Sequence, residues 1–220
     1  MSHSFTPPFS LLPASLPVFP LPGAVVMPGC QLPLNIFEPR YLNMVFDALG
    51  ADRMIGMVQP DPSMTDEDTD ALSRTGTAGR ITSFSETQDG RLIIVLTGVC
   101  RFDVGEELAG TRGYRRVMAR WERFAVDYET DAGKHEECHR LYSLLRAYFV
   151  RKSMEVDDLL MEKMPVTSLV NLMIGQLPFE TAERQALVEA VSLGERLESL
   201  ARLIEFKLAE PQIQSAARRH

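Results

Sequence analysis

The stretch PLNIFEPRYLNMVFDALG, residues 33–50, joins two kinds of pattern within one short segment. Leu34 and Ile36 alternate with polar or small residues, as in a half-buried strand. Pro39 suits the first turn of a helix, because its missing N–H loses no hydrogen bond there, and Gly50 suits the end of one. The stretch therefore predicts a strand that leads directly into a helix starting at Pro39.

The predicted helix has an apolar face at helical spacing, and we expect that face to pack on a sheet. Its members are Tyr41, Val45, Ala48 and Leu49. Glu38 lies beside the positive end of the helix, and Arg40 is placed to neutralise it. Each residue of the stretch can thus be explained by a role in the fold, so we interpret the stretch as a structural corner rather than a ligand contact.

Short strands surround this corner. Apolar runs separated by Pro, Gly and turn residues predict strands, and Asp89-Gly90 predicts a tight hairpin. The expected segments are 16–23, 31–37, 53–59, 77–86, 91–99, 100–108 and 114–124. Six or seven such strands predict a barrel or a sandwich.

Beyond residue 126 the hydrophobic period changes to 3.6, which predicts a bundle of four or five helices. The predicted helical segments are 139–152, 156–164, 168–177, 183–193 and 195–208, separated by Pro165, Pro178 and Gly194. Strands followed by helices indicate an α+β chain in two lobes. We expect a β lobe over 16–126 and a helical lobe over 127–210, with a flexible arm over 1–15 and a flexible tail over 211–220.

Composition excludes several classes of function. The 220 residues carry a net charge of −7, with a pI near 5.2, so the chain repels nucleic acid and anionic membranes on average. Three cysteines without a C-x-x-C pair indicate neither a disulfide framework nor a zinc knuckle. No apolar run is long enough to span a bilayer. We expect a cytoplasmic protein that uses no metal and no cofactor.

HEECH, residues 135–139, is the one match to a catalytic motif, the H-E-x-x-H pattern of zinc proteases. On a helix, His135 and His139 flank the apolar stripe, whereas Glu136 points to the opposite side. A working site needs all three to converge on one metal with a further protein ligand. We therefore favour an incidental match, and keep a metal-dependent hydrolase as an alternative.

Two further groups of residues are candidates for binding. The segment TRGYRRVMARWERF, residues 111–124, is rich in Arg, and RNA binding is an alternative function. In a strand, however, Arg116 and Arg120 face away from Arg115 and Arg123, which splits the charge. Methionine can form an adaptable contact surface, so Met57, Met161 and Met164 are candidate polypeptide contacts.

Taken in order, the blocks FPLPGAVVMPGCQLPLNIFEPRYLNMVFDAL, RMIGMV, RTGTAGRI, DGRLIIVLTGVCRF and QLPFETAERQALVEA resemble the N-terminal substrate-binding domain of Lon ATP-dependent proteases. The most specific blocks are IFEPRY and G-V-x-R-F. Their family-motif residues, which we interpret as structural, are Ile36, Phe37, Glu38, Pro39, Arg40, Tyr41, Arg101 and Phe102.

The resemblance implies an antiparallel, PUA-like β-barrel lobe with one short helix, followed by a helical lobe. It also implies a domain that contacts unfolded or partly folded polypeptides, or a protein partner. No residues here match the ATPase or protease motifs of Lon, and the sequence ends at His220. We therefore expect a stand-alone, non-enzymatic polypeptide-binding module.

Overall fold

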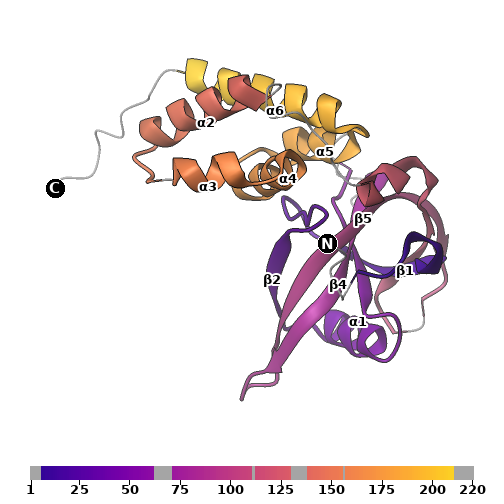
Figure 1. The fold of residues 1–220 in the computed structure, drawn as a ribbon. Helices are drawn as coiled ribbons and strands as arrows, with labels where there is room; N and C mark the ends of the chain where they lie inside the picture. Colours follow the sequence, from indigo (N-terminus) through magenta and orange to yellow (C-terminus); the bar gives the residue numbers. More distant parts are fainter. Residues whose placement is uncertain (1–5, 62–70, 111, 130–137, 156, 211–220) are drawn as a thin grey trace.

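A computed structural model describes residues 6–61, 71–110, 112–129, 138–155 and 157–210. A strand-rich lobe and a helical lobe lie side by side (Figure 1). The strands are β1 (Ser15–Pro20), β2 (Gln31–Ile36), β3 (Met54–Val58), β4 (Thr75–Glu86), β5 (Leu92–Leu108) and β6 (Arg115–Arg120). The helices are η1 (Phe9–Leu11), α1 (Pro39–Leu49), η2 (Glu122–Tyr128), α2 (His139–Arg151), α3 (Asp158–Lys163), α4 (Val166–Gln176), α5 (Thr181–Glu189) and α6 (Leu193–Ala209). The α+β architecture predicted from the sequence is confirmed.

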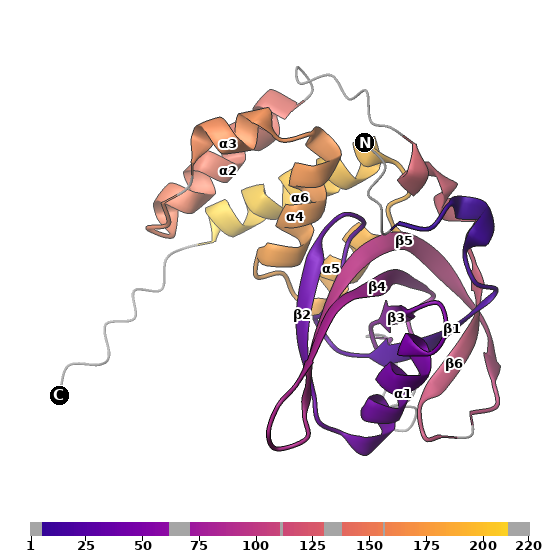
Figure 2. The same cartoon turned by 60° about the horizontal axis from the view of Figure 1, so that its bottom comes forward.

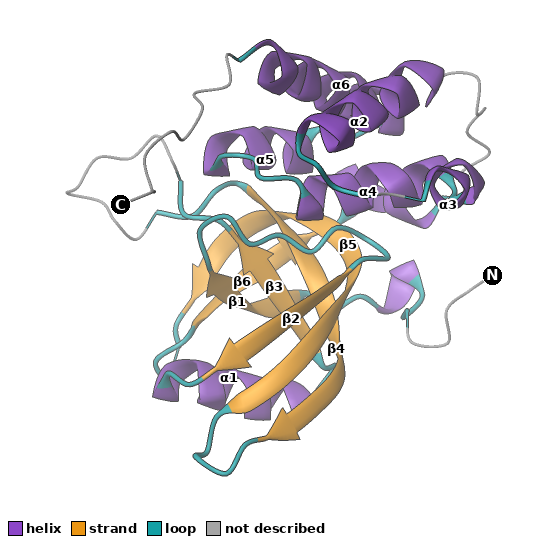
Figure 3. Ribbon diagram, turned by 90° about the vertical axis from the view of Figure 1, so that its left-hand side faces the viewer, coloured by secondary structure: helices purple, strands orange, loops and turns teal. Residues whose placement is uncertain are grey.

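The strands form a single mixed sheet in the order β2-β5-β4-β3-β1-β6, and β6 also pairs with β5. This second pairing closes five strands into a barrel and leaves β2 attached outside the ring through β5 (Figure 3). All pairs are antiparallel except β1 and β3, which are parallel. The exception to the expected antiparallel barrel arises because β2 and α1 connect β1 to β3 as a crossover.

β5 is one strand of 17 residues, where the sequence pattern predicted two strands with a break near Cys100. Its first half pairs with β2 and its second half with β6, while β4 follows it along most of its length. The pairing with β4 shifts register between Ala78 and Gly79. A long strand that bends at such irregularities can pair with one strand along its first half and with another along its second half. No local sequence pattern indicates this double pairing.

The predicted strand over 114–124 is shorter in the structure. β6 ends at Arg120, and Arg123 lies in η2. The expected split of the arginines between two faces of one strand is therefore wrong for Arg123. The expected lobe boundary at residue 126 falls within η2. Asp127 of η2 accepts a hydrogen bond from the backbone N–H of Arg101 in β5.

Helix α1 begins at Pro39 and ends at Leu49, as predicted. Its buried side chains are Tyr41, Met44, Val45 and Ala48, and Leu49 is only partly buried. Compared with the predicted apolar face, the buried face of the helix is therefore rotated slightly towards Met44 and away from Leu49. Arg40 pairs with Glu38 at 2.9 Å, and both side chains are about half exposed. The corner predicted from NIFEPRY is present.

The described part of the helical lobe contains five helices. α2 lies beside α6, and α4 and α5 also contact α6 (Figure 1). Pro165 precedes α4 as expected, but Gly194 lies inside α6 rather than between helices. The reason is that Ser192 caps α6 and forms a capping box with Glu195, which fixes the start of the helix.

The described part of the N-terminal segment contacts the barrel. Phe9 packs edge-on against Tyr128, with ring centroids 5.4 Å apart, and Trp121 donates a hydrogen bond from Nε1 to Pro13 O. Within the residues that the structure describes, no helix has the length and apolar character needed to cross a membrane.

The segment between β1 and β2 joins the two lobes. Met27 is buried in the core of the helical lobe, and Val25 and Cys30 pack against that core. Gly98 of β5 lies directly under this segment, and it exchanges backbone hydrogen bonds with Gly29 and Cys30. A Cβ at Gly98 would lie 2.7 Å from the carbonyl carbon of Met27 and 2.8 Å from Val26 O. Only glycine permits this close approach.

We predict that Gly98→Ala lowers the free energy of unfolding by about 2–3 kcal/mol, because the added methyl group displaces the bridging segment. Urea denaturation followed by circular dichroism measures this change. The matched control is Gly194→Ala, where the new Cβ meets no atom within 4 Å. This control is expected to be neutral or slightly stabilising, since Ala favours a helix over Gly. Equal effects of the two substitutions would contradict the role given to Gly98.

Candidate functional site at the lobe junction and the barrel end

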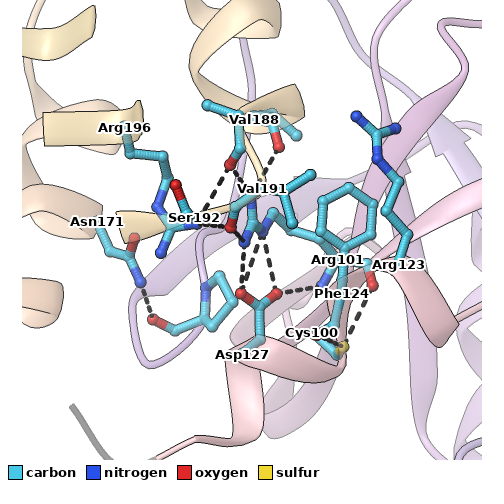
Figure 4. A network of polar contacts seen from close by, with 12 residues as sticks. Cys100, Arg101, Arg123, Phe124, Asp127, Asn171, Val188, Val191, Ser192 and Arg196 are labelled. Carbon is cyan, nitrogen blue, oxygen red and sulfur yellow. Dashed lines mark hydrogen bonds and ion pairs between the residues drawn. The ribbon is translucent and has the colours of Figure 1, made fainter. Parts of the chain in front are cut away.

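Arg101 of β5 is the central polar residue of the junction between the lobes (Figure 4). Its side chain is fully buried, and it forms an ion pair with Asp127, whose side chain is 2% exposed. Arg101 Nη2 lies 2.6 Å from Asp127 Oδ1, and the Arg101 backbone N–H donates to Oδ2 at 2.9 Å. The guanidinium also stacks over Phe124, 4.5 Å from the ring centroid. The carboxylate thus neutralises a charge that would otherwise be costly to bury.

The same guanidinium binds the end of α5. Arg101 Nη1 donates to Val188 O at 3.1 Å and to Ala190 O, and Nη2 donates to Val191 O at 2.9 Å. The last carbonyls of a helix lack partners within it and carry partial negative charge, so a cation is favourable there. Arg101 therefore connects the barrel to the helical lobe.

Buried amides make a second connection. Gln59, just after β3, donates from Nε2 to Gln185 Oε1 of α5 at 2.9 Å. Gln185 Nε2 in turn donates to Thr75 O at 3.1 Å, which connects α5 to β4. Asn171 of α4 donates to Pro28 O at 3.0 Å. Because unpaired buried amides are destabilising, these bonds select one arrangement of the lobes.

The family-motif residues lie mostly in this scaffold. Phe102 is fully buried, and its ring occupies the space above Gly56 and Gly76, where a Cβ would lie within 3.1 Å of the ring. Ile36 and Tyr41 are buried in the core beside α1. Phe37 differs from them, because 62% of its surface is exposed. The structural interpretation of the motif thus leaves Phe37 without a packing role.

Helix α1 and the β4–β5 hairpin lie at the same end of the barrel (Figure 2), and large apolar side chains on these and adjoining elements are exposed. Phe37 follows β2, Phe46 lies on α1, Phe84 on β4 and Ile93 on β5, and 47–62% of their surface is exposed. The strand register places Asn35 and Ser85 opposite Ile93, and Phe84 opposite Ile94. We refer to Phe37, Phe46, Phe84 and Ile93 as the barrel-end surface. Phe84 and Ile93 therefore point to opposite faces of the sheet, and exposed apolar groups of this size are typical of contact sites for other proteins.

The three methionines selected from the sequence do not come together. Met57 is 2% exposed in the core beside α1, whereas Met161 is 5% exposed in the helical core, with Met164 partly buried against it. In this conformation Met57 and Met161 present no surface to a partner. The sequence did not indicate Phe84 or Ile93 as binding residues, because the serines on both sides of Phe84 predict by strand alternation that Phe84 faces the core.

The HEECH motif lies largely outside the described residues, since these include neither His135 nor Glu136. His139 is exposed at the first residue of α2. Within the described part of the chain, no three His, Cys, Asp or Glu side chains are grouped to hold a metal ion.

Most arginines of the 111–124 segment have acidic or polar partners. Arg115 pairs with Glu107 at 2.5 Å, Arg123 pairs with Asp103 at 3.0 Å, and Arg116 donates to Ser15 Oγ. Arg112 pairs with Asp47. Three of these four arginines thus pair with carboxylates, whereas the partner of Arg116 is a hydroxyl group. This neutralisation weakens any attraction to a phosphate backbone.

The thiols near the junction are not arranged for nucleophilic chemistry. Burial raises the pKa of Cys30 to about 11, and burial beside Asp127 raises the pKa of Cys100 further. Since the thiolate is the reactive form, both thiols are protonated at neutral pH.

We predict that iodoacetamide at pH 8 labels Cys30 and Cys100 slowly in the folded protein and rapidly in urea. The raised pKa leaves far less than about one percent of Cys30 as thiolate at that pH. Site-resolved mass spectrometry measures each rate. Fast labelling of native Cys30 would show that this thiol is not protected.

We predict that Arg101→Met and Asp127→Asn each lower the free energy of unfolding by about 3–5 kcal/mol, because each leaves a buried polar group without its partner. Their effects should be strongly non-additive in the double variant.

The comparison is the exposed pair Glu38–Arg40, where Glu38→Gln, Arg40→Met and the double variant should show a coupling of about 0.2–1 kcal/mol. Urea titrations of all variants give both coupling energies. A coupling at Arg101–Asp127 no larger than that of the exposed pair would contradict the central role of Arg101.

Comparison with known proteins identifies the family. The Lon protease of Trichlorobacter lovleyi is 29% identical over 218 residues, covering 94% of this chain and 26% of that protein, and the Lon protease of Parabacteroides distasonis is 26% identical over 221 residues. The chain spans about a quarter or less of the length of the curated relatives it matches.

Solved structures agree. A Lon N-terminal domain protein from Xanthomonas campestris matches with a TM-score of 0.62 and 26% identity, covering 86% of this chain and 97% of that one. The N-terminal domain of Mycobacterium avium complex Lon protease shares the fold, with a TM-score of 0.65 and 18% identity. The family described as the ATP-dependent protease La (LON) substrate-binding domain matches residues 15–205. The chain belongs to the Lon substrate-binding domain family.

Proposed function

We propose that this chain is a non-catalytic module that binds unfolded or partly folded polypeptides, or a protein partner. Membership of a substrate-binding domain family supports a binding role.

The observation that carries the proposal is the barrel-end surface. Phe37, Phe46, Phe84 and Ile93 expose aromatic and aliphatic groups on neighbouring elements of one lobe. Unfolded chains differ from folded ones chiefly by exposing such groups, so apolar contact selects for them. The rigid junction at Arg101 holds this surface on a stable scaffold, which lowers the entropic cost of binding.

The cysteines support a reducing compartment such as the cytoplasm. Cys30 and Cys100 form no disulfide bond. Disulfides are rare in that compartment. We propose a cytoplasmic location on this basis.

We predict that wild-type protein binds a reduced, carboxymethylated test protein and does not bind its native form. Replacing both Phe37 and Phe84 with Ser should weaken this binding about tenfold or more, since central aromatic contacts carry a large share of binding energy. Fluorescence titration measures the affinities.

The matched control is Phe206→Ser on α6, because Phe206 is 61% exposed and Phe37 is 62% exposed. This change in the other lobe should leave binding within about twofold of the wild type. Equal binding of native and unfolded test protein would overturn the proposed function. An equal loss in the Phe206 variant would show that the barrel-end surface is not the contact.

A further inference from the structure

One edge of β2 has no partner strand among the residues that the structure describes. β2 pairs only with β5, whereas the other five strands close on one another through the β5–β6 pairing. The open edge lies on the side of β2 away from β5 (Figure 3). Such an edge leaves backbone N–H and C=O groups ready to pair with another extended chain.

One backbone hydrogen bond fixes which peptide groups face this open edge. Gly98 N donates to Cys30 O at 2.9 Å, and the register continues to Ile36 opposite Leu92. Hydrogen-bonded pairs alternate along an antiparallel ladder, so the even-numbered residues of β2 bond to β5. The open edge therefore presents the N–H groups of Gln31 and Asn35 and the C=O groups of Gln31, Pro33 and Asn35.

The edge is uncharged. Natural sheets usually protect an edge with charged side chains or proline, and here Pro33 is the one such residue within β2. Just beyond the strand, Glu38 and Arg40 neutralise each other at 2.9 Å. A charged segment would lose the hydration of its charges at this edge without gaining an ion pair. An uncharged segment has no such hydration to lose. The charge pattern thus selects an uncharged occupant.

Two apolar side chains lie near β2, and one of them, Ile93, is on β5, across β2 from the open edge. Ile93 shares one face of the sheet with Asn35, which it faces in the register, and Phe37 lies just past the end of β2. Both are exposed. Every second side chain of an added strand would contact this face.

We propose that the open edge of β2 binds an extended, uncharged segment of an unfolded polypeptide by adding it to the sheet as a further strand. This inference rests on the proposed function and names its chemistry. Main-chain hydrogen bonds make the contact largely independent of sequence, and Phe37 at the end of β2 favours apolar residues beside it. A folded protein has already paired its own backbone groups, and so it is not bound.

The test uses two labelled heptapeptides of the sequence TVTVTVT, which differ only in backbone N-methylation. The first is methylated on alternate residues, so that it cannot self-associate but keeps one edge of free N–H groups. The second is methylated on every residue and keeps the side chains without any backbone N–H donor. Fluorescence anisotropy should show that the protein binds the second at least about tenfold more weakly than the first. Equal binding of the two peptides would overturn the proposal.

A substitution in the protein gives an independent test. Asn35→Pro removes an N–H from the open edge but none of the bonds to β5, whereas the matched control Asn35→Ala keeps that N–H. The Pro variant should bind the first peptide about three- to tenfold more weakly than the Ala variant, with both unfolding at similar urea concentrations. A Pro variant that binds as well as the Ala variant would overturn the edge assignment.

Two further outcomes separate this inference from the proposed function. If the first peptide does not bind while the unfolded test protein still binds through Phe37 and Phe84, the edge assignment fails and the proposed function stands. If light scattering shows a dimer that Asn35→Pro dissociates, a second copy occupies the edge, and the proposal is likewise overturned.

Discussion

The buried guanidinium of Arg101 is the interaction on which the arrangement of the two lobes depends. It lies on the longest strand, is neutralised by Asp127 from η2 and donates to the carbonyls that end α5. A charge in this position is stable only when all of these partners are in place. Forming the junction therefore requires the barrel, η2 and the helical lobe to be folded together.

The rest of the junction follows from this constraint. The segment between β1 and β2 passes over Gly98 and inserts Met27 into the helical core, so the barrel supplies part of the core of its neighbour. The amides of Gln59 and Gln185 fix the same orientation a short distance away. The opposite end of the barrel takes no part in these contacts between the lobes. Phe37, Phe84 and Ile93 are exposed there, beside a strand with an open and uncharged edge. The structure thus separates the part that provides stability from the part that we propose to bind polypeptides.

Local patterns in the sequence predicted most individual elements. Helix α1 was placed at both ends because Pro39 and Gly50 act within one turn of the backbone. The helical segments followed from a period of 3.6, and the hairpin followed from Asp89-Gly90, where Gly90 has the positive φ that the turn needs. The candidate methionines were less informative. Burial depends on which strands and helices meet, so the sequence could not distinguish the buried Met57 from a surface residue.

The sequence by itself determined most of the elements, the order of strands before helices and the family, because turns, caps and hydrophobic periods are short-range properties of the chain. Only the tertiary structure decided that β5 is continuous, that Asp127 neutralises Arg101 and that β2 lies outside the closed ring. Each of these depends on residues far apart in the chain, such as Arg101 and Val188. Such contacts form through packing and pairing in three dimensions, and no local pattern encodes them. Phe37 illustrates both contributions. The sequence identifies it as part of a family motif, and only the tertiary structure shows that its side chain is exposed.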